Sequence, residues 1–266
     1  MQATSPNQKI ACPVCGANQL TPILKKKAMP LYNLELHRSR ADALAAARGD
    51  LDYYQCSGCT FVFNAAFNPS LMNYKVAYNN DRALSQIYRA YMDTVCERIN
   101  NMFDITGKTI VEVGCGSGEF LKQLHQKYSF RGYGYDPNLS AANNHHETLT
   151  FINDYYRADL AKPDLLILRH TLEHLGDPHV FLDEITGTQA PRLALAPAKR
   201  VDLYIEVPAW EWIVERNQIF AFSFEHCSYY TKPALEKTLT KHGFQTRKLS
   251  FGFKGEHLEY YGTRKN

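Results

Sequence analysis

One strand–loop–helix segment constrains this chain more than any other. An apolar stretch over residues 109–113 is typical of a buried β-strand, and Gly114, Gly116 and Gly118 follow it before a helix-like stretch over 120–128. Glycine lets the backbone turn sharply and approach a ligand closely. The first turn of a helix offers N–H groups that have no partner inside the helix. The segment therefore predicts a nucleotide-type pocket at the carboxyl end of a strand.

The spacing of the glycines distinguishes between nucleotide ligands. Dinucleotide-binding loops carry G-x-G-x-x-G, but here the third glycine comes one residue earlier and Glu119 stands where that fingerprint has glycine. A second strand is expected over 131–135, and Asp136 follows it at a chain distance that suits an acid gripping ribose hydroxyls. With Glu112 ahead of the glycines, this pattern resembles the S-adenosylmethionine (SAM) site of class I methyltransferases.

Composition and charge exclude several classes of protein. The chain has 266 residues, of which 45% are hydrophobic and 21% charged, which is an ordinary globular balance. The net charge of +3 and a longest basic run of three lysines, residues 25–27, do not predict nucleic-acid binding. No apolar run of about 18 residues predicts a membrane span, and the polar first residues do not form a signal peptide. We therefore expect a cytoplasmic protein that keeps its thiols reduced.

Four of the seven cysteines form two C-x-x-C pairs, Cys12 with Cys15 and Cys56 with Cys59. Two such pairs place four thiolates on two tight turns, which suits tetrahedral zinc. Four thiolates close the coordination shell, so we expect the zinc to be structural. A zinc ribbon can also dock nucleic acid, but no basic stripe interleaved with aromatic residues supports that role here. Residues 1–65 are therefore expected to form a zinc-binding module.

The rest of the chain alternates between strand-like and helix-like segments. Residues 66–104 are expected to form a linker and a lead-in helix, and residues 105–266 the main domain. Strands are expected at 109–113, 131–135, 149–152, 164–169, 201–207, 245–251 and 257–263. Helices are expected at 40–48, 84–103, 120–128, 180–186 and 232–242. The alternation predicts an α/β fold whose parallel sheet carries helices on both faces. The terminal hairpin matches the antiparallel last strand of the Rossmann-like, seven-stranded class I methyltransferase core.

Polar residues directly after the fourth expected strand are the first candidates for chemistry. His170, Glu173 and His174 lie there, where the strands of an open α/β sheet meet the ligand crevice. His170 and His174 are one helical turn apart, so both can share a face. A metal site is another interpretation of this set, but the H-E-x-x-H order of zinc peptidases is absent.

An aromatic stretch near residue 225 holds the second candidate group. Glu225 and His226 lie between Phe224 and Cys227. They can be a hydrogen-bonded pair that pins the loop. Alternatively, His226 or His174 is a general base near neutral pH, with Glu225 orienting it or binding substrate. The residues alone leave both interpretations open.

Taken together, five motifs make the resemblance specific. These motifs are C-P-x-C-G, a later C-x-x-C, E-V-G-C-G-S-G, H-T-L-E-H-L-x-D-P and F-E-H-x-S-Y-Y-T. Their sum resembles SAM-dependent methyltransferases with an N-terminal zinc-binding domain, a group that includes C-methyltransferases acting on nucleotide-linked keto-deoxysugars. The resemblance implies that a base removes a proton next to a ketone and that the resulting carbon nucleophile takes the SAM methyl group.

The resemblance also implies roles for particular residues. His174 matches the histidine after the fourth strand, and Glu225 and His226 match a late Glu-His pair in which His226 is favoured as the base. A family tyrosine falls at Ser223 here, so Tyr74 or Tyr78 is expected to replace it. The expected cofactor contacts are Glu112, Gly114, Gly116, Gly118, Asp136, Asn153, Asp154 and His170. The glycines shape the methionine side, and Glu112 orients the loop or the SAM amino group. Asp136 is expected to hold the ribose, and Asn153 with Asp154 to meet the adenine. His170 is expected to lie near the sulfonium.

Several alternatives remain at this point. Sugar C-methyltransferases of this group carry a further C-terminal Rossmann-like domain, whereas this sequence ends at Asn266. We therefore expect a smaller or differently held acceptor, or a partner or homodimer that supplies the missing surface. O-methylation of a sugar or small metabolite stays open, because the same histidine would deprotonate a hydroxyl. A non-catalytic zinc-ribbon protein is a further rival, which the intact glycine loop, Asp136 and the Glu225–His226 pair disfavour. A nicotinamide oxidoreductase is another, which the glycine spacing disfavours.

Overall fold

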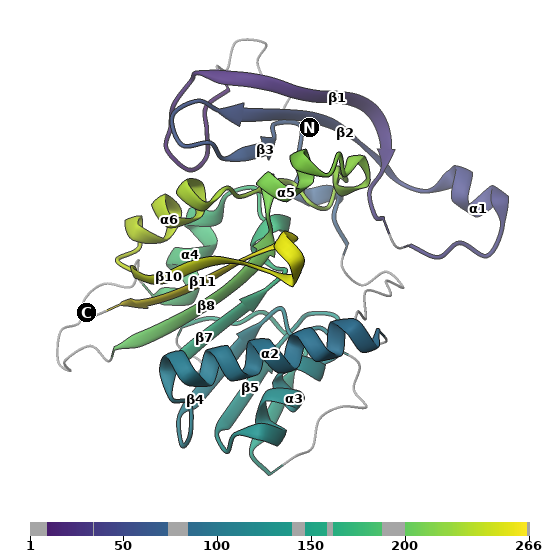
Figure 1. Ribbon diagram of the computed structural model, residues 1–266. Helices are drawn as coiled ribbons and strands as arrows, with labels where there is room; N and C mark the ends of the chain where they lie inside the picture. Colours follow the sequence, from purple (N-terminus) through teal and green to yellow (C-terminus); the bar gives the residue numbers. More distant parts are fainter. Residues whose placement is uncertain are drawn as a thin grey trace.

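A computed structural model describes residues 10–33, 35–73, 85–139, 147–158, 162–187 and 200–264 of the chain. Two β-sheets dominate it (Figure 1). The larger sheet has seven strands in the order β10-β11-β8-β7-β4-β5-β6. Their bounds are β4 Thr109–Val113, β5 Arg131–Tyr135, β6 Leu149–Ile152, β7 Leu165–Arg169, β8 Val201–Pro208, β10 Gln245–Gly252 and β11 His257–Arg264. β11 runs antiparallel to both β8 and β10, and β4 to β8 are mutually parallel. The predicted fold class is therefore confirmed.

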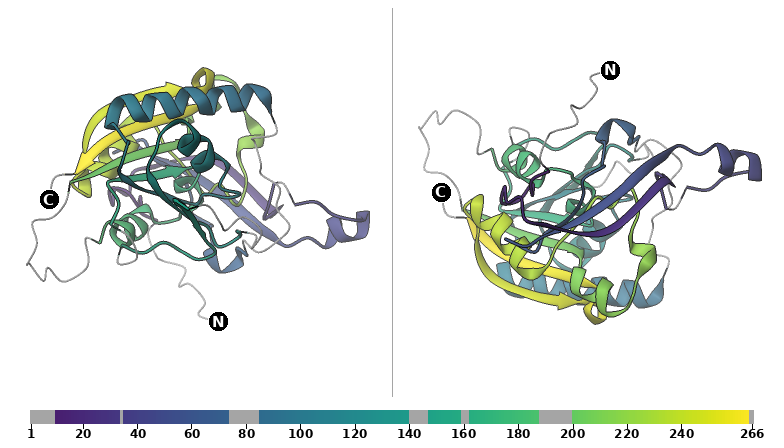
Figure 2. Two further views of the ribbon diagram at one scale, coloured as in Figure 1. Left: turned by 90° about the horizontal axis from the view of Figure 1, so that it is seen from below. Right: turned by 90° about the horizontal axis from the view of Figure 1, so that it is seen from above.

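Helices cover both faces of the large sheet (Figure 2). Their bounds are α2 Gln86–Phe103, α3 Glu119–Lys127, α4 Pro178–Thr186 and α6 Lys232–Lys241. A further helix, α5 Trp210–Glu215, packs instead with residues of the small sheet. Ile110 and Ile167 pack with the apolar residues of α2 and α3, whereas Val111 and Leu166 pack with those of α4 and α6. Successive strand residues face opposite sides, so a strand covered on both faces is mostly apolar, and a charged residue inside it, such as Glu112, is an exception.

The boundaries of the main elements follow local signals in the sequence. Ser85 caps α2, and Asp177 caps α4 ahead of Pro178. A side-chain oxygen at this position accepts an N–H group that the helix leaves unpaired. Each strand of the large sheet begins and ends within one residue of its expected range. Among the described residues, no helix combines the length and the apolar character that crossing a bilayer requires.

The smaller sheet has four strands in the order β1-β2-β3-β9. The first three come from the N-terminal part of the chain, β1 Leu20–Pro30, β2 Arg48–Cys56 and β3 Val62–Asn64. The fourth, β9 Ser228–Tyr229, comes from the segment after the large sheet's fifth parallel strand, and it pairs antiparallel with β3. The short helix α1, Arg40–Ala45, lies beyond one end of the β1–β2 pair (Figures 1 and 2). The four strands of the small sheet and helix α5 were not predicted from the sequence.

Candidate active site and cysteine cluster

The glycine loop after β4 adopts backbone conformations that favour glycine at each of its three positions. Gly114, Gly116 and Gly118 have φ values of 76°, 55° and 78°. A Cβ on Gly114 would stand 2.5 Å from Oγ1 of Thr171, and a Cβ on Gly118 would collide with the Phe151 ring. At Gly116, by contrast, no heavy atom in the described part of the chain lies within 4 Å of that position. Packing thus requires two of the glycines, and the third faces open space.

The loop is tied to the end of the neighbouring strand. Asp136 follows β5, and its Oδ2 accepts a hydrogen bond of 2.9 Å from the N–H of Gly116. Its Oδ1 accepts another of 2.8 Å from the N–H of Asn138. Asn153 and Asp154 follow β6 and are exposed, and the Asn153 amide donates to the carbonyl of Leu139. The strand order therefore brings the residues expected around a cofactor to one edge of the sheet.

Glu112 lies within β4, just before the glycine loop, and is 2% exposed. Among the described residues, its Oε2 atom has no hydrogen-bond partner. Burial raises the pKa of this carboxyl to about 8, because a charged form without compensation is disfavoured in the interior. A cationic group bound at the loop would provide the missing compensation. After Gly118, α3 begins without a side-chain cap, so its first N–H groups are also suited to a ligand.

A second buried carboxylate, Glu206 on β8, organises the adjacent strand ends. Its Oε1 accepts from Arg169 Nη2 at 3.0 Å and from His170 Nε2 at 2.9 Å. Its Oε2 accepts from the hydroxyls of Tyr91 and Tyr204, both at 2.9 Å. Burial alone would raise the pKa of Glu206, but the charge of Arg169 and nearby imidazoles hold it well below its usual value. The network was not predicted, although a charged residue inside an apolar strand was a signal for it.

His170 is held between two carboxylates at the end of β7. Its Nε2 contacts Glu206, and its Nδ1 lies 3.3 Å from Oε1 of Glu173. Its backbone has a φ of 52°, which is uncommon for a residue with a side chain. Such conformations persist where the surroundings over-determine them, and they concentrate at functional sites.

Three of the predicted residues meet around Glu173, in the 3-10 turn Leu172–His174. A carboxylate oxygen of Glu173 and ring nitrogens of His174 and His226 all lie within 4.8 Å of one another. The rings of His174 and His226 are in edge-to-face contact, with centroids 4.8 Å apart. Burial opposes ionisation of Glu173, but His170 and the other two imidazoles lower its pKa to about 2. The carboxylate among the histidines is therefore ionised near neutral pH.

Glu225 takes part in this arrangement through its main chain and its side chain. Its carbonyl oxygen accepts a hydrogen bond of 2.9 Å from Nδ1 of His174. Its carboxylate is buried, and Oε1 accepts from the N–H of Asn33 at 3.0 Å. Tyr74 and Tyr78, proposed as replacements for the family tyrosine, lie outside the described residues.

The two C-x-x-C pairs come together in the N-terminal part of the chain. The Sγ atoms of Cys12 and Cys59 are 3.5 Å apart, as are those of Cys15 and Cys56, and all four lie within 4.8 Å of one another. Zinc–sulfur bonds of about 2.3 Å in a tetrahedron separate the sulfurs by about 3.8 Å. The hydrogen bond from Cys59 lowers the pKa of Cys12 to about 5, against the effect of burial. The donor set and its spacing fit structural zinc.

The segment that carries His226 is fastened to the small sheet. β9 pairs with β3 through Val62–Tyr229 and Phe63–Ser228. The N–H of Asn64 donates to the carbonyl of Cys227 at 2.8 Å. The module with the cysteine cluster therefore builds one wall of the histidine site.

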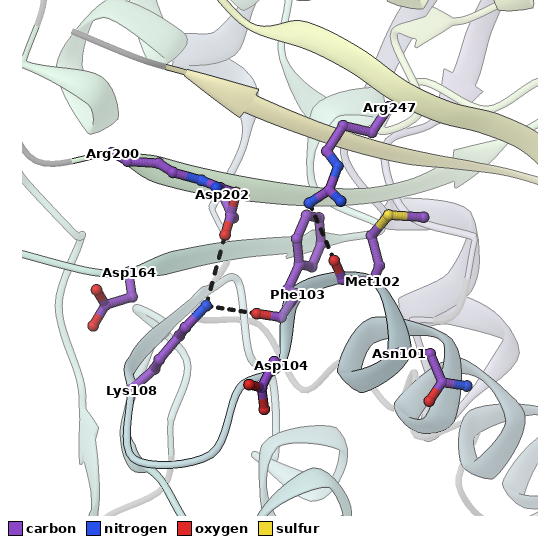
Figure 3. Close-up of a pocket in the computed structure, with 9 residues that line it drawn as sticks. All are labelled: Asn101, Met102, Phe103, Asp104, Lys108, Asp164, Arg200, Asp202 and Arg247. Carbon is purple, nitrogen blue, oxygen red and sulfur yellow. Dashed lines mark hydrogen bonds and ion pairs between the residues drawn. The ribbon is translucent and has the colours of Figure 1, made fainter.

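A hollow of about 390 Å³ lies at the opposite end of the large sheet (Figure 3). Lys108 and Arg200 in its lining immediately precede β4 and β8. Lys108 Nζ donates to the carbonyl of Phe103 and lies 3.9 Å from Asp202, and Arg200 also bonds Asp202. The lining of the hollow carries as many basic as acidic side chains, so it does not favour a charged ligand of either sign. Ligands of open α/β sheets bind at the carboxyl ends of the strands, whereas this hollow lies at the amino ends. The glycine loop and the histidines, not this hollow, form the candidate active site.

Comparison with known proteins agrees with this geometry. A family model described as "Methyltransferase domain" matches residues 87–249. The C-methyltransferase NovU of Streptomyces niveus is 24% identical over 248 residues, covering 88% of this chain and 56% of that protein. The chain therefore spans little more than half the length of this curated relative.

The fold is shared with solved methyltransferase structures, among them two with bound SAH. The plantazolicin methyltransferase BpumL, in complex with a triazolic desmethylPZN analog and SAH, has a TM-score of 0.52 at 15% identity, covering 70% of this chain and 88% of that chain. Magnesium protoporphyrin IX methyltransferase (ChlM) from Synechocystis PCC 6803 with bound SAH has a TM-score of 0.50 at 16% identity, covering 67% and 84%.

Proposed function

This chain belongs to the methyltransferase-domain family, and we propose that it is a SAM-dependent methyltransferase that methylates a carbon next to a carbonyl group. The acceptor we propose is a small sugar-like metabolite, in the first instance a nucleotide-linked keto-sugar. The observation that carries the proposal is the contact between the glycine loop and the histidine turn. Thr171, between His170 and Glu173, packs on Gly114 and donates to the carbonyl of Val113 at 3.1 Å.

The residues around the glycine loop suit the cofactor. Bound SAM supplies an electrophilic methyl group on a sulfonium centre. In this proposal Gly116 leaves room for the methionine part, and Glu112 accepts from the cofactor's ammonium group. Asp136 holds the ribose hydroxyls, and Asn153 with Asp154 borders the adenine. The open space at Gly116 and the uncompensated Oε2 of Glu112 support these assignments.

The histidines supply the base. In this proposal His226, or else His174, takes a proton from the acceptor carbon, and the electron pair of the broken C–H bond forms an enolate. The enolate carbon would then bond to the methyl group as the methyl–sulfur bond breaks, and the sulfur would keep the electron pair of that bond as a neutral thioether. A base near neutral pH suits this step, because imidazole changes charge in that range. The Nδ1–H of His174 donates to the carbonyl of Glu225, so the lone pair of its neutral ring is on Nε2. His170, held by Glu206 and Glu173, shapes the wall near the sulfonium in this proposal.

The choice of carbon as the acceptor atom draws support from the curated relative. NovU carries the description C-methyltransferase, and its similarity extends over 88% of this chain. A hydroxyl acceptor is the second candidate, because the same histidine would remove its proton.

SAM with a carbon-13 methyl group, offered to nucleotide-linked keto-sugars and to hydroxylated metabolites, tests the proposal. The chemical shift of the transferred methyl distinguishes a C–CH₃ product from an O–CH₃ product. A carbon-bound methyl supports the proposal, and an oxygen-bound methyl replaces it with the second candidate. Exchange of the acceptor's α-proton with deuterated solvent should also slow at least tenfold in His226→Gln or His174→Gln. If both variants keep full exchange and turnover, neither residue is the base.

A further inference from the structure

One carboxylate in the active site is buried without the hydrogen bonds that burial normally requires. Glu173 is 0% exposed, and neither of its side-chain oxygens has a hydrogen-bond donor within the part of the chain that the structure describes. Nearly all buried polar groups in native proteins are hydrogen-bonded, so each exception needs an explanation. A buried charge is retained only where opposite charge compensates it.

The surroundings of Glu173 show where that compensation comes from. His170 Nδ1 lies 3.3 Å from Oε1, and nitrogens of His174 and His226 lie within 4.8 Å. His170 is also bound to Glu206 through Nε2, which Tyr88 contacts at 3.2 Å. Its ring is thus committed to the polar network. His174 ends the turn Leu172–His174, and His226 lies in the loop just before β9. In this inference these two imidazoles, rather than that of His170, face the acceptor.

We infer that Glu173 is a positioning residue that supplies the counter-charge for the imidazolium formed on His226 or His174 during proton abstraction. This inference rests on the proposed function. The proton leaves the acceptor, resides on the imidazole nitrogen and then passes to solvent, while Glu173 stays ionised throughout. An ion pair at low effective dielectric stabilises the imidazolium more than it would in water, so the histidine becomes a stronger base.

The other ionisable groups near the histidines do not provide the same charge. Burial raises the pKa values of Tyr53, Tyr229 and Cys227, so these groups are neutral near pH 7. Glu206, on β8, already accepts hydrogen bonds from Arg169, His170 and two tyrosines. Glu225, beside His226, accepts from the main chain of Asn33. Glu173 differs from both acids because the groups that face its carboxylate are imidazoles: His170 at 3.3 Å, and His174 and His226 within 4.8 Å.

Nuclear magnetic resonance of the full chain with ring-labelled histidine tests the inference. The histidine titrations of wild type and Glu173→Gln are compared in buffer stripped of divalent cations. We expect at least one apparent pKa of the His174/His226 pair to fall by about one unit or more in Glu173→Gln, which is a tenfold loss of proton affinity. Glu259→Gln is the matched control, because Glu259 is also 0% exposed but is bonded by Tyr91, Arg98 and Tyr261. It should leave both histidines unchanged.

The pH dependence of turnover gives a second readout that a merely structural role would not move. The acidic limb of the kcat profile should shift to lower pH in Glu173→Gln, in the direction of the histidine shift. Unchanged histidine titrations in folded Glu173→Gln would overturn the inference, as would a shift in Glu225→Gln that Glu173→Gln lacks. If Glu173→Gln does not fold, Glu173→Asp is used instead, because it moves the carboxylate away from the imidazoles by one methylene. We then expect a smaller fall in the histidine pKa values. Unaltered histidine titrations in folded Glu173→Asp would also overturn the inference. The titrations need no acceptor, so failure of the proposed reaction is recognised separately.

Discussion

The hydroxyl of Tyr53, on β2 of the small sheet, lies 2.6 Å from the carbonyl oxygen of His226 and 2.7 Å from that of Ser223. Tyr53 is fully buried, and its ring also packs against Phe222 and Tyr229. One side chain of the cysteine-bearing module thus holds both ends of the turn that presents His226. The part of the chain that carries the cysteine cluster thus also supports the segment that holds the proposed base.

Tyr53→Phe tests this link. The change removes the shared donor and leaves two buried carbonyl groups less well bonded, which should lower the free energy of unfolding by about 1–3 kcal/mol. Turnover should fall several-fold with little change in SAM affinity, because the glycine loop is not touched. Thermal unfolding, calorimetric SAM binding and methyl-transfer kinetics measure these effects. Tyr54→Phe is the control, since its hydroxyl makes one long contact of 3.5 Å with Asp52. Equal turnover in the two variants would show that the link does not position His226.

Cys56→Ser tests the metal site. Cys56 is 0% exposed within the cluster, and loss of one thiolate opens the tetrahedral shell. We expect metal analysis to find about one zinc ion per wild-type chain and far less in the variant. The midpoint of thermal unfolding should also fall, because structural zinc contributes folding free energy directly. Cys96→Ser, a buried thiol on α2, should retain the metal. Zinc content equal to wild type in Cys56→Ser would exclude the four-thiolate site.

Gly116→Ala and Gly107→Ala form a matched pair for the cofactor loop. Both glycines have positive φ, 55° and 73°, and neither Cβ would meet a heavy atom of the described chain within 4 Å. Both substitutions should destabilise the protein similarly, by about 1–2 kcal/mol of backbone strain. Gly116→Ala alone should weaken SAM binding, at least tenfold, because its methyl group enters the space assigned to the cofactor. Isothermal titration calorimetry measures the affinities. Equal affinities in the two variants would place the cofactor elsewhere.

Glu112→Gln should change how stability depends on pH. The pKa of Glu112 is about 8 in the folded protein and 4.5 in the reference state, so the folded form holds its proton more tightly. Between these values the unfolded state binds fewer protons, and the free energy of unfolding falls as pH rises. The full difference is on the order of 5 kcal/mol.

Thermal melts of the cofactor-free protein from pH 5 to pH 8 provide the measurement. Wild type should lose stability across this range, and Glu112→Gln should lose much less. SAM should stabilise wild type more than the variant at pH 8, because its ammonium group would offset the Glu112 charge. A wild-type melting temperature that rises steadily from pH 5 to pH 8, in parallel with the variant, would contradict the burial of an uncompensated acid.

The strands of the large sheet were predictable because their signals are local. Apolar runs such as 165–168, the caps Ser85 and Asp177, and the glycines after β4 each act within a few residues. In the small sheet, β2 does alternate between buried and more exposed positions over 48–53 and was missed, whereas β1 and β9 lacked a local signal. β1 carries three consecutive lysines and is largely exposed, so its residues show no alternation of buried and exposed positions. β9 has two residues, and its pairing with β3 exists only after the chain has folded.

The sequence by itself determined the cofactor-type loop, the acid after the second strand and the four metal-binding thiols, because each depends on residue types at short, fixed spacing. The sequence placed Glu173 beside His174 and near His170, but tertiary structure alone brought His226 to this acid. Glu225 adjoins His226 in the sequence, whereas Glu173 comes from the turn after β7. Which charges meet in a buried site depends on contacts between distant segments, and no local pattern encodes such contacts. The same holds for Tyr53 and His226, since the chain must form both sheets before that hydroxyl reaches that carbonyl.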